Sequence, residues 1–178
     1  KDNYLPRIMA GELQMAFAYA EPQSRYHLNN VRCSVSKTNN SFFITGQKSV
    51  VLNGNHAKTL IVAARTSGGT NDKDGISLFI VDANHPSVKR QGYANVDGHQ
   101  AADIWFDNTP TLELLGEQDK ALPTINDIID KAPLPICADA VCSLHIAPDG
   151  TLEYTKSRKH LLTTLYSFNL LHDQMIHM

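Results

Sequence analysis

Few of the side chains that commonly perform chemistry stand at the spacings that such chemistry requires. The sequence holds eight histidines and three cysteines. His172 and His177 lack companions at zinc-ligand spacing, and Cys137 and Cys142 do not form a C-x-x-C pair. No phosphate-binding glycine loop, G-x-G-x-x-G fingerprint or nucleophile elbow is present. We therefore expect no metal site in this sequence and no catalytic serine of the nucleophile-elbow type.

The overall composition predicts a globular protein. Its 178 residues suit one domain, or one domain and part of another. The net charge of −2, without a dense run of lysine or arginine, argues against nucleic-acid binding. Apolar runs such as Leu60–Ala64 are too short to span a membrane. Because there is no secretory leader and no even set of cysteines, we expect a cytoplasmic protein with reduced thiols.

The first part of the chain alternates short apolar runs with turn residues. Asn53-Gly54 is a strong turn signal between two such runs. About seven short strands at this spacing are typical of an antiparallel barrel or sandwich. The predicted strands are Leu13–Ala20, Val31–Ser36, Ser41–Gln47, Val50–Leu52, Thr59–Arg65, Ile76–Val81, Val88–Tyr93 and Ala101–Phe106.

The hydrophobic period becomes helical after Gly116. Leu122, Ile125, Ile128 and Ile129 recur at the spacing of one helix face. The predicted helices are Asp119–Lys131, Leu134–Ile146, Leu152–Lys159 and Phe168–Met178, with the tail of an earlier helix at 3–10.

This change of period predicts two domains. We expect a β domain over residues 1–118 and the start of a helical domain over residues 119–178. Pro148 predicts that the helical segment breaks at Ala147 or kinks there, because an interior proline costs roughly 3 kcal/mol. Lys1 is not a natural start and Met178 falls inside a helical pattern, so we expect an excerpt from a longer protein.

Several segments, in order along nearly the whole chain, match motifs of one known family. Phe17–Pro22 resembles A-x-T-E-P, and Thr45–Gly54 resembles G-x-K-x-W-I-T-N-G. The later matching segments are Gly98, Ala102–Ile104 with Phe106–Asn108, Leu114–Glu117 and Leu152–Lys159. The sequence resembles the acyl-CoA dehydrogenase family, and it is most similar to the small-subunit branch of the pimeloyl-CoA dehydrogenase type.

The resemblance implies a multi-domain α+β architecture. An antiparallel β-barrel or sandwich domain would be followed by the first helices of an antiparallel four-helix bundle. Members form homo- or hetero-oligomers, usually dimers or tetramers. FAD lies between the β domain and the C-terminal helices, and its nucleotide end reaches a neighbouring subunit. Electron-transfer flavoprotein is the implied electron acceptor.

The resemblance also implies a reaction of fatty acid metabolism. A carboxylate base removes the α-proton of an acyl-CoA thioester, and the β-hydrogen leaves as hydride to flavin N5. The thioester oxygen needs hydrogen bonds as negative charge develops on it, and the base must lie within reach of the proton. We expect the base beyond Met178. Ala132 stands where some relatives keep this glutamate.

Five residues are implied to contact the flavin ring. Phe17, Tyr19 and Ala20 would run along it, and Ala20 stands where the family often has a threonine, so only its backbone could donate. Val50 and Leu52 take the places of the family's tryptophan and threonine. The alternative for all five is an ordinary place in a β-sheet core.

Five further residues are implied to contact the CoA substrate or the FAD nucleotide. Arg25 and Tyr26 replace a glycine-rich loop near the acyl-CoA entrance, and the Arg25 guanidinium suits a phosphate or a carboxylate. Asp130 aligns with an acid that contacts CoA. Arg158 matches an arginine that binds the FAD pyrophosphate across the subunit interface, and Asn169 matches a cofactor-contacting glutamine. Solvent-exposed surface positions are the alternative for these residues.

Two other functions remain open from the sequence. The replaced side chains at Ala20, Val50, Leu52 and Leu161 also fit a non-catalytic partner subunit of a heteromeric acyl-CoA dehydrogenase with weak or absent FAD. A third hypothesis is another flavin chemistry on the same fold, as an oxidase or a monooxygenase.

Overall fold

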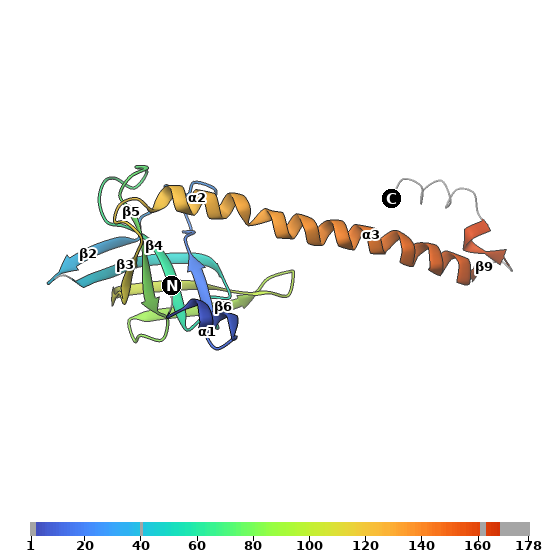
Figure 1. The fold of residues 1–178 in the computed structure, drawn as a ribbon, viewed down its shortest axis with the longest axis horizontal. Helices are drawn as coiled ribbons and strands as arrows, with labels where there is room; N and C mark the ends of the chain where they lie inside the picture. Colours follow the sequence, from blue (N-terminus) through green and yellow to red (C-terminus); the bar gives the residue numbers. More distant parts are fainter. Residues whose placement is uncertain (1–2, 40, 161–162, 168–178) are drawn as a thin grey trace. The chain divides into compact units, whose positions relative to one another are not determined.

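The computed structural model describes residues 3–39, 41–160 and 163–167 (Figure 1). The chain divides into two compact units, Lys1–Asp127 and Ile128–Met178. This division falls inside helix α2 (Ala121–Lys131). The domain boundary between residues 118 and 119 stays a prediction about the whole protein.

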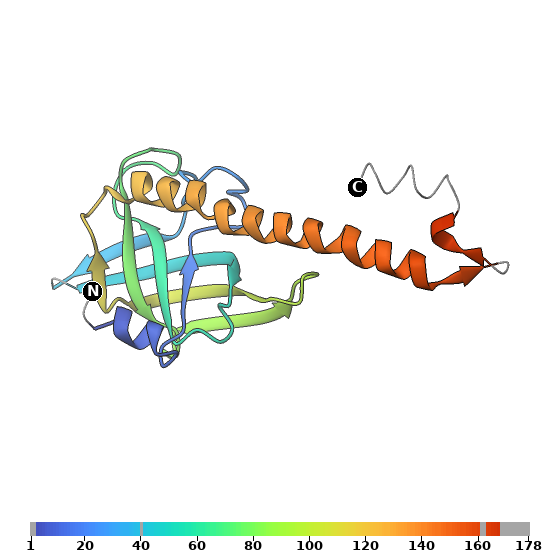
Figure 2. The same ribbon diagram turned by 45° about the vertical axis from the view of Figure 1, so that its right-hand side comes forward.

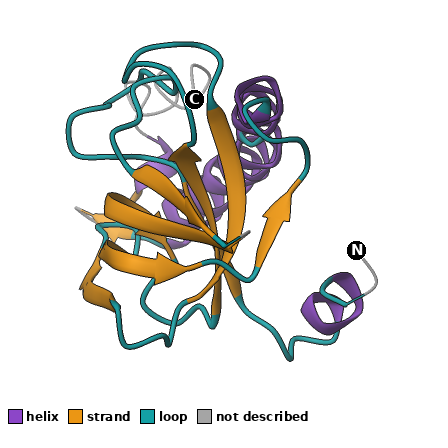
Figure 3. Cartoon of the chain, turned by 90° about the vertical axis from the view of Figure 1, so that its left-hand side faces the viewer, coloured by secondary structure: helices purple, strands orange, loops and turns teal. Residues whose placement is uncertain are grey.

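Eight strands of the described residues form one mixed sheet in the first unit. Their order is β6-β7-β3-β2-β4-β5-β8, and β1 also pairs with β4. Figure 3 shows these strands gathered into one curved sheet. The strands are β1 (Met15–Ala18), β2 (Ser34–Thr38), β3 (Ser41–Leu52), β4 (Thr59–Arg65), β5 (Ile76–Asp82), β6 (Val88–Ala94), β7 (Gln100–Pro110) and β8 (Glu113–Leu115), with the short helix α1 (Leu5–Met9) before them.

The prediction of an antiparallel barrel or sandwich is corrected in two respects, because the sheet is mixed and it stays open. β1 runs parallel to β4 along Thr59–Val62. β2 then meets β4 with Ser34 opposite Arg65, also parallel. Since β5 pairs with β4 along its whole length, β1 and β2 must share the other edge of β4. Residues 19–33 therefore leave the sheet between two strands that continue in the same direction.

The core of the first unit is made of apolar side chains from β3, β4, β5 and β7. Ile44, Leu60, Phe79 and Ile104 are fully buried, and full burial of such a side chain contributes roughly 1.5–3 kcal/mol. Ile125 is buried as well, so the first turns of α2 help to close this core. The predicted helix Asp119–Lys131 is thereby confirmed, with its first helical residue two positions later.

Two long loops meet at one end of the sheet (Figure 2). The loops are residues 19–33 and residues 66–75. Arg65 is buried at the end of β4, and its guanidinium donates to the carbonyls of Asn29 at 2.7 Å and Thr70 at 2.9 Å. It also donates to those of Asp72 and Asp74 at 3.1 and 2.8 Å. One buried cation thus satisfies backbone groups of both loops.

A buried ion pair joins the first loop to β3. Lys48 Nζ donates to Glu21 Oε1 at 2.7 Å, and the two side chains are 0% and 2% exposed. Lys48 Nζ also donates to the Tyr19 carbonyl at 3.2 Å. Burying both charges is costly, and this cost is offset only when their remaining hydrogen-bonding capacity is used.

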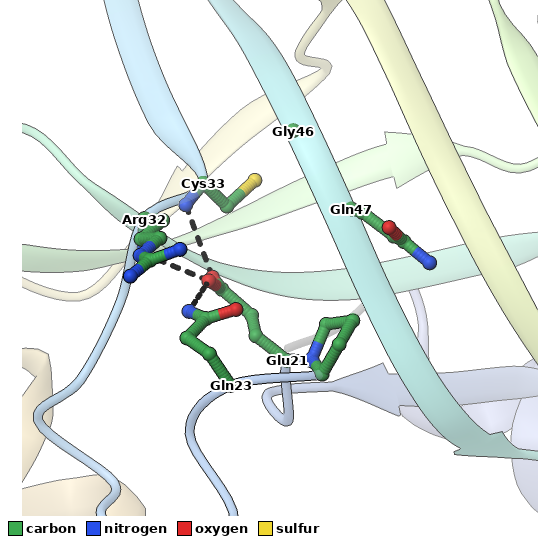
Figure 4. A pocket seen from close by; sticks show the side chains of 7 residues that line it. Glu21, Gln23, Arg32, Cys33, Gly46 and Gln47 are labelled. Carbon is green, nitrogen blue, oxygen red and sulfur yellow. Dashed lines mark hydrogen bonds between the residues drawn. The ribbon is translucent and has the colours of Figure 1, made fainter.

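The Glu21 carboxylate has further donors on its other side (Figure 4). Oε2 accepts from the Gln23 side chain at 2.6 Å and from the Arg32 backbone N–H at 2.8 Å. Oε1 accepts from the Cys33 backbone N–H at 3.1 Å. The carboxylate therefore fixes both the start of the loop and the approach to β2.

The second unit is dominated by α3 (Pro133–Ser157), a single helix. The predicted break at Ala147 is wrong, because the helix continues through Pro148. The Thr151 hydroxyl donates to the Ala147 carbonyl at 2.8 Å beside this proline. Pro133 occupies the first turn, where its missing N–H is not needed.

The segment after α3 differs from the sequence prediction. Arg158 is extended, and β9 (Lys159–His160) pairs with β10 (Thr163–Thr164), so the helix predicted to reach Lys159 ends earlier. A 3₁₀ turn, η1 (Leu165–Ser167), follows. The predicted helix Phe168–Met178 lies outside the described residues, and the four-helix bundle stays a prediction.

Replacing Lys48 with methionine should lower the free energy of unfolding by roughly 3–5 kcal/mol, because the buried Glu21 carboxylate would lose its cation. Urea denaturation measures the change. The matched control is Lys120→Met, which removes an exposed pair with Asp74 and should cost no more than about 1 kcal/mol. Equal losses of unfolding free energy in the two variants would contradict the claim that burial makes the Glu21–Lys48 pair more important for stability than an exposed pair.

Acid should remove the stabilisation that Glu21 provides. Burial raises the pKa of this carboxyl, but the Lys48 ammonium and the hydrogen bonds outweigh burial, so the pKa lies below the ordinary 4.5. The contribution is then fully present above pH 4.5 and is lost as the pH falls through the lower folded-state pKa. We expect the stability difference between the wild type and Glu21→Gln to be constant near neutral pH and to shrink in acid. A difference that persists at strongly acidic pH would show that Glu21 is not the titrating group.

Candidate functional site

A β-bulge in β3 lies at the centre of the predicted flavin motif. Lys48 pairs with Ile104 and Val51 pairs with Ala102, so Ser49 and Val50 together oppose the single residue Asp103. Val50 has a φ of 52°, which a β-branched residue rarely adopts. Bulges of this kind re-aim side chains beside functional sites. The two strands predicted at Ser41–Gln47 and Val50–Leu52 are therefore one strand with an irregularity.

The bulge exposes two apolar side chains. Val50 is 56% exposed and Leu52 is 61% exposed, whereas Val51 between them is buried. We call Val50 and Leu52 the ledge. Exposed aliphatic side chains next to each other gain from being covered by a flat apolar surface, so the ledge is suited to a planar ligand.

The end of β1 lies beside this bulge. Ser49 N–H donates to the Ala20 carbonyl at 3.0 Å, which joins the two segments directly. The rings of Phe17 and Tyr19 lie 5.1 Å apart between their centroids, and both side chains are half-buried. The structure thus brings Phe17, Tyr19 and Ala20 next to the strand that carries the ledge.

Asp103 is held between the bulge and β6. Its Oδ1 accepts from the Val50 backbone N–H at 3.1 Å and from the Tyr93 hydroxyl at 3.1 Å. Burial raises the pKa of Tyr93, and the hydrogen bond and charge of Asp103 raise it further. The Tyr93 hydroxyl therefore keeps its proton and remains a donor near neutral pH.

An open pocket of about 480 Å³ lies beside Glu21. Figure 4 shows its lining, in which the segment Arg32–Cys33 lies across from Gly46 on β3. A side chain at Gly46 would come within 2.7 Å of the Cys33 Cα, so the two segments pack too closely for any other residue. Burial raises the pKa of the Cys33 thiol to about 11, which keeps it protonated and unreactive.

The remaining predicted residues lie elsewhere. Arg25 and Tyr26 are exposed in the first loop, and Tyr26 is 96% exposed. Asp130 near the end of α2 and Arg158 after α3 are exposed and belong to the second unit. Asn169 lies outside the described residues. The roles assigned to all these positions stay predictions.

Four residues that organise this region had no structural role in the sequence-based predictions. Lys48 and Asp103 stood inside matched motifs, but a motif does not reveal that a lysine is fully buried or that an aspartate faces a bulge. Glu21 also stood inside a matched motif, Phe17–Pro22, which does not reveal its buried ion pair with Lys48. Tyr93 carried no signal, because its contact with Asp103 depends on the pairing of β6 with β7.

No group of three or more histidine, cysteine or carboxylate side chains among the described residues is arranged to bind a metal ion. No helix in that part of the chain is both long and apolar enough to cross a membrane.

Three comparisons relate the chain to known proteins. It is 25% identical over 183 aligned residues to the mitochondrial isovaleryl-CoA dehydrogenase of Oryza sativa subsp. japonica, covering 100% of this chain and 44% of that protein. It is 28% identical over 163 residues to an acyl-CoA dehydrogenase of Bacillus subtilis (strain 168), covering 89% of this chain and 43% of that protein. The crystal structure of a probable acyl-CoA dehydrogenase from Mycobacterium abscessus shares the fold, with a TM-score of 0.91, 18% identity and coverage of 99% of this chain and 48% of that one.

The chain therefore spans less than half the length of these relatives. A family model described as the acyl-CoA dehydrogenase middle domain matches residues 16–109, which is more than half of the 178 residues. Acyl-CoA dehydrogenases are FAD-containing oxidoreductases of acyl-CoA metabolism. The matched segment contains the ledge, the Glu21–Lys48 pair and Asp103, and the chain belongs to the acyl-CoA dehydrogenase family.

Proposed function

We propose that the protein containing this chain dehydrogenates an acyl-CoA thioester between its α and β carbons, with FAD as the hydride acceptor. The observation that carries this proposal is the ledge of Val50 and Leu52, exposed within the family's middle domain. The hydrogen bond from the Ser49 N–H to the Ala20 carbonyl joins β3 to the segment after β1. Backbone polar groups of that segment therefore lie near the strand that carries the ledge. This combination suits a ring system with apolar faces and polar edges.

The residues present fit a flavin ring in one respect and differ from the family pattern in another. The ledge offers apolar contact to a ring face, as the larger aromatic ring at this position does in other members. Ala20 has no hydroxyl, so hydrogen bonds to the ring edge must come from the backbone. When bound, FAD would supply the acceptor for the substrate's β-hydrogen.

The chain's own residues would bind and orient rather than transfer the α-proton. The ledge and the half-buried rings of Phe17 and Tyr19 would exclude water from one side of the cofactor. The exposed Arg25 and Tyr26 are free to contact the CoA end of the substrate, and the Arg25 fork suits a phosphate. We place the base beyond Met178, since Ala132 cannot remove a proton.

The second unit supports a place in a larger helical assembly. Apolar side chains of α3 are exposed, among them Leu134, Ile136, Leu144 and Ile146, and a helix with apolar residues on several sides is normally buried by partners. We propose that α3 belongs to the family's four-helix bundle within an oligomer.

In that assembly several contacts would come from this second unit. Arg158 and Asn169 would contact the FAD nucleotide, and Asp130 would contact CoA. Electron-transfer flavoprotein is the proposed electron acceptor. The pimeloyl-CoA subtype and a cytoplasmic location stay predictions.

The purified protein, at the length that its gene encodes, should be yellow and should show the visible absorbance bands of bound flavin. Anaerobic addition of a suitable acyl-CoA should bleach these bands, because substrate oxidation reduces the flavin. A series of straight, branched and dicarboxylic acyl-CoA thioesters would identify the substrate class. Protein that stays colourless after incubation with FAD, or flavin that no thioester in the series bleaches, would contradict the proposal.

Introducing a charge on the ledge should weaken FAD binding. In Val50→Asp the carboxylate would lose hydration beneath the ring, and we expect the dissociation constant to rise about tenfold or more. Aspartate adopts a positive φ more readily than valine, so the variant should fold. The control is Val96→Asp, because Val96 is fully exposed in the turn between β6 and β7. The affinity for FAD is measured by flavin fluorescence titration. Equal affinities in the two variants would show that the ledge is not part of the flavin site.

A further inference from the structure

Val50 adopts a backbone conformation in the bulge that is unusual for a β-branched residue. At a φ of 52° the β-branched side chain crowds its own backbone, and such strain persists only when surrounding contacts impose it. The regular ladder cannot impose it, because the register of β3 against β7 shifts between Lys48 and Val51. A contact from outside the ladder must therefore hold Val50.

The Asp103 side chain provides that contact. It comes from the single β7 residue opposite the bulge, and its Oδ1 accepts the Val50 N–H at 3.1 Å. At the register shift this N–H lacks a regular ladder partner on β7, and the carboxylate supplies an acceptor in its place. A charged acceptor also makes the hydrogen bond stronger than a carbonyl would.

Tyr93 holds the carboxylate in turn. Gln91 is directly opposite Asp103 in the pairing of β6 with β7, so Tyr93 lies on the diagonal, where long side chains still meet. Its hydroxyl donates to the same Oδ1 at 3.1 Å. Three neighbouring strands thus converge on one oxygen atom.

We propose that Asp103, supported by Tyr93, is a positioning residue of the flavin site. Its carboxylate holds Val50 in the left-handed conformation that turns the ledge outward and leaves the Ser49 N–H for Ala20. This inference rests on the proposed function, because the ledge matters only if a flavin covers it. Without the acceptor, β3 would relax toward a regular strand, and both the ledge and the Ser49–Ala20 hydrogen bond would shift.

The first test compares two substitutions at Asp103 in the protein at its encoded length. Asp103→Ala should raise the FAD dissociation constant about tenfold, as expected for loss of a hydrogen bond to a charged group. Asp103→Asn should stay within about threefold of the wild type, because its amide oxygen can still accept the Val50 N–H. The visible spectrum of the bound flavin should change in the alanine variant and be restored in the asparagine variant. Asp107→Ala, which removes an exposed carboxylate from the same strand, should leave both properties unchanged.

The second test uses Val50→Gly as the background. Glycine adopts a positive φ without strain, so the conformation no longer depends on the carboxylate. In this background Asp103→Ala should change the FAD dissociation constant by less than about threefold, which a double-mutant cycle reports as coupling between the two positions. If Asp103 had only a general structural role, Asp103→Ala would change the FAD dissociation constant equally with valine and with glycine at position 50.

The outcomes separate this inference from the proposed function. A wild type that binds no FAD overturns the proposed function, and this inference falls with it. If the wild type binds FAD and Asp103→Ala binds it equally well, or if the loss is the same with valine and glycine at position 50, this inference alone is overturned. Circular dichroism and urea denaturation of each variant show whether it is folded.

Discussion

The buried Glu21–Lys48 pair is the constraint on which the rest of the first unit depends. Its two charges meet 2.7 Å apart with almost no exposure to solvent. The carboxylate receives backbone N–H groups from the approach to β2, and the ammonium reaches the Tyr19 carbonyl. Because an unpaired charge at this depth would be strongly destabilising, the loop of residues 19–33 has to return to β3 and β4 in one arrangement.

That arrangement is compatible with the proposed flavin site, although several family side chains have been replaced. Lys48 of the ion pair donates to the Tyr19 carbonyl, the Ser49–Ala20 hydrogen bond joins this segment to β3, and the Asp103 carboxylate accepts the Val50 N–H in the bulge. These are contacts of backbone groups and buried charges. None of these contacts uses the side chain of Val50 or Leu52.

The sequence predicted most strands and the change to helix, because hydrophobic period and turn residues are local properties. It did not predict the parallel pairing of β1 with β4, which depends on where the chain returns after residue 33. It predicted that the helical segment breaks at Ala147 or kinks there, whereas α3 continues through Pro148. The hydrophobic periodicity of one strand does not predict the bulge either. A bulge depends on how two strands pair, because two residues of one strand lie opposite one residue of the other. The candidate flavin residues came from family motifs, whereas the roles of Lys48 and Asp103 required the fold.

A crystal structure of the protein with bound FAD would decide whether the ledge belongs to the flavin site. We expect electron density for the flavin ring against Val50 and Leu52, with the Ala20 backbone at its edge and Val50 at a positive φ. Flavin density away from this ledge, or a regular β3 without the bulge at Ser49 and Val50, would contradict it.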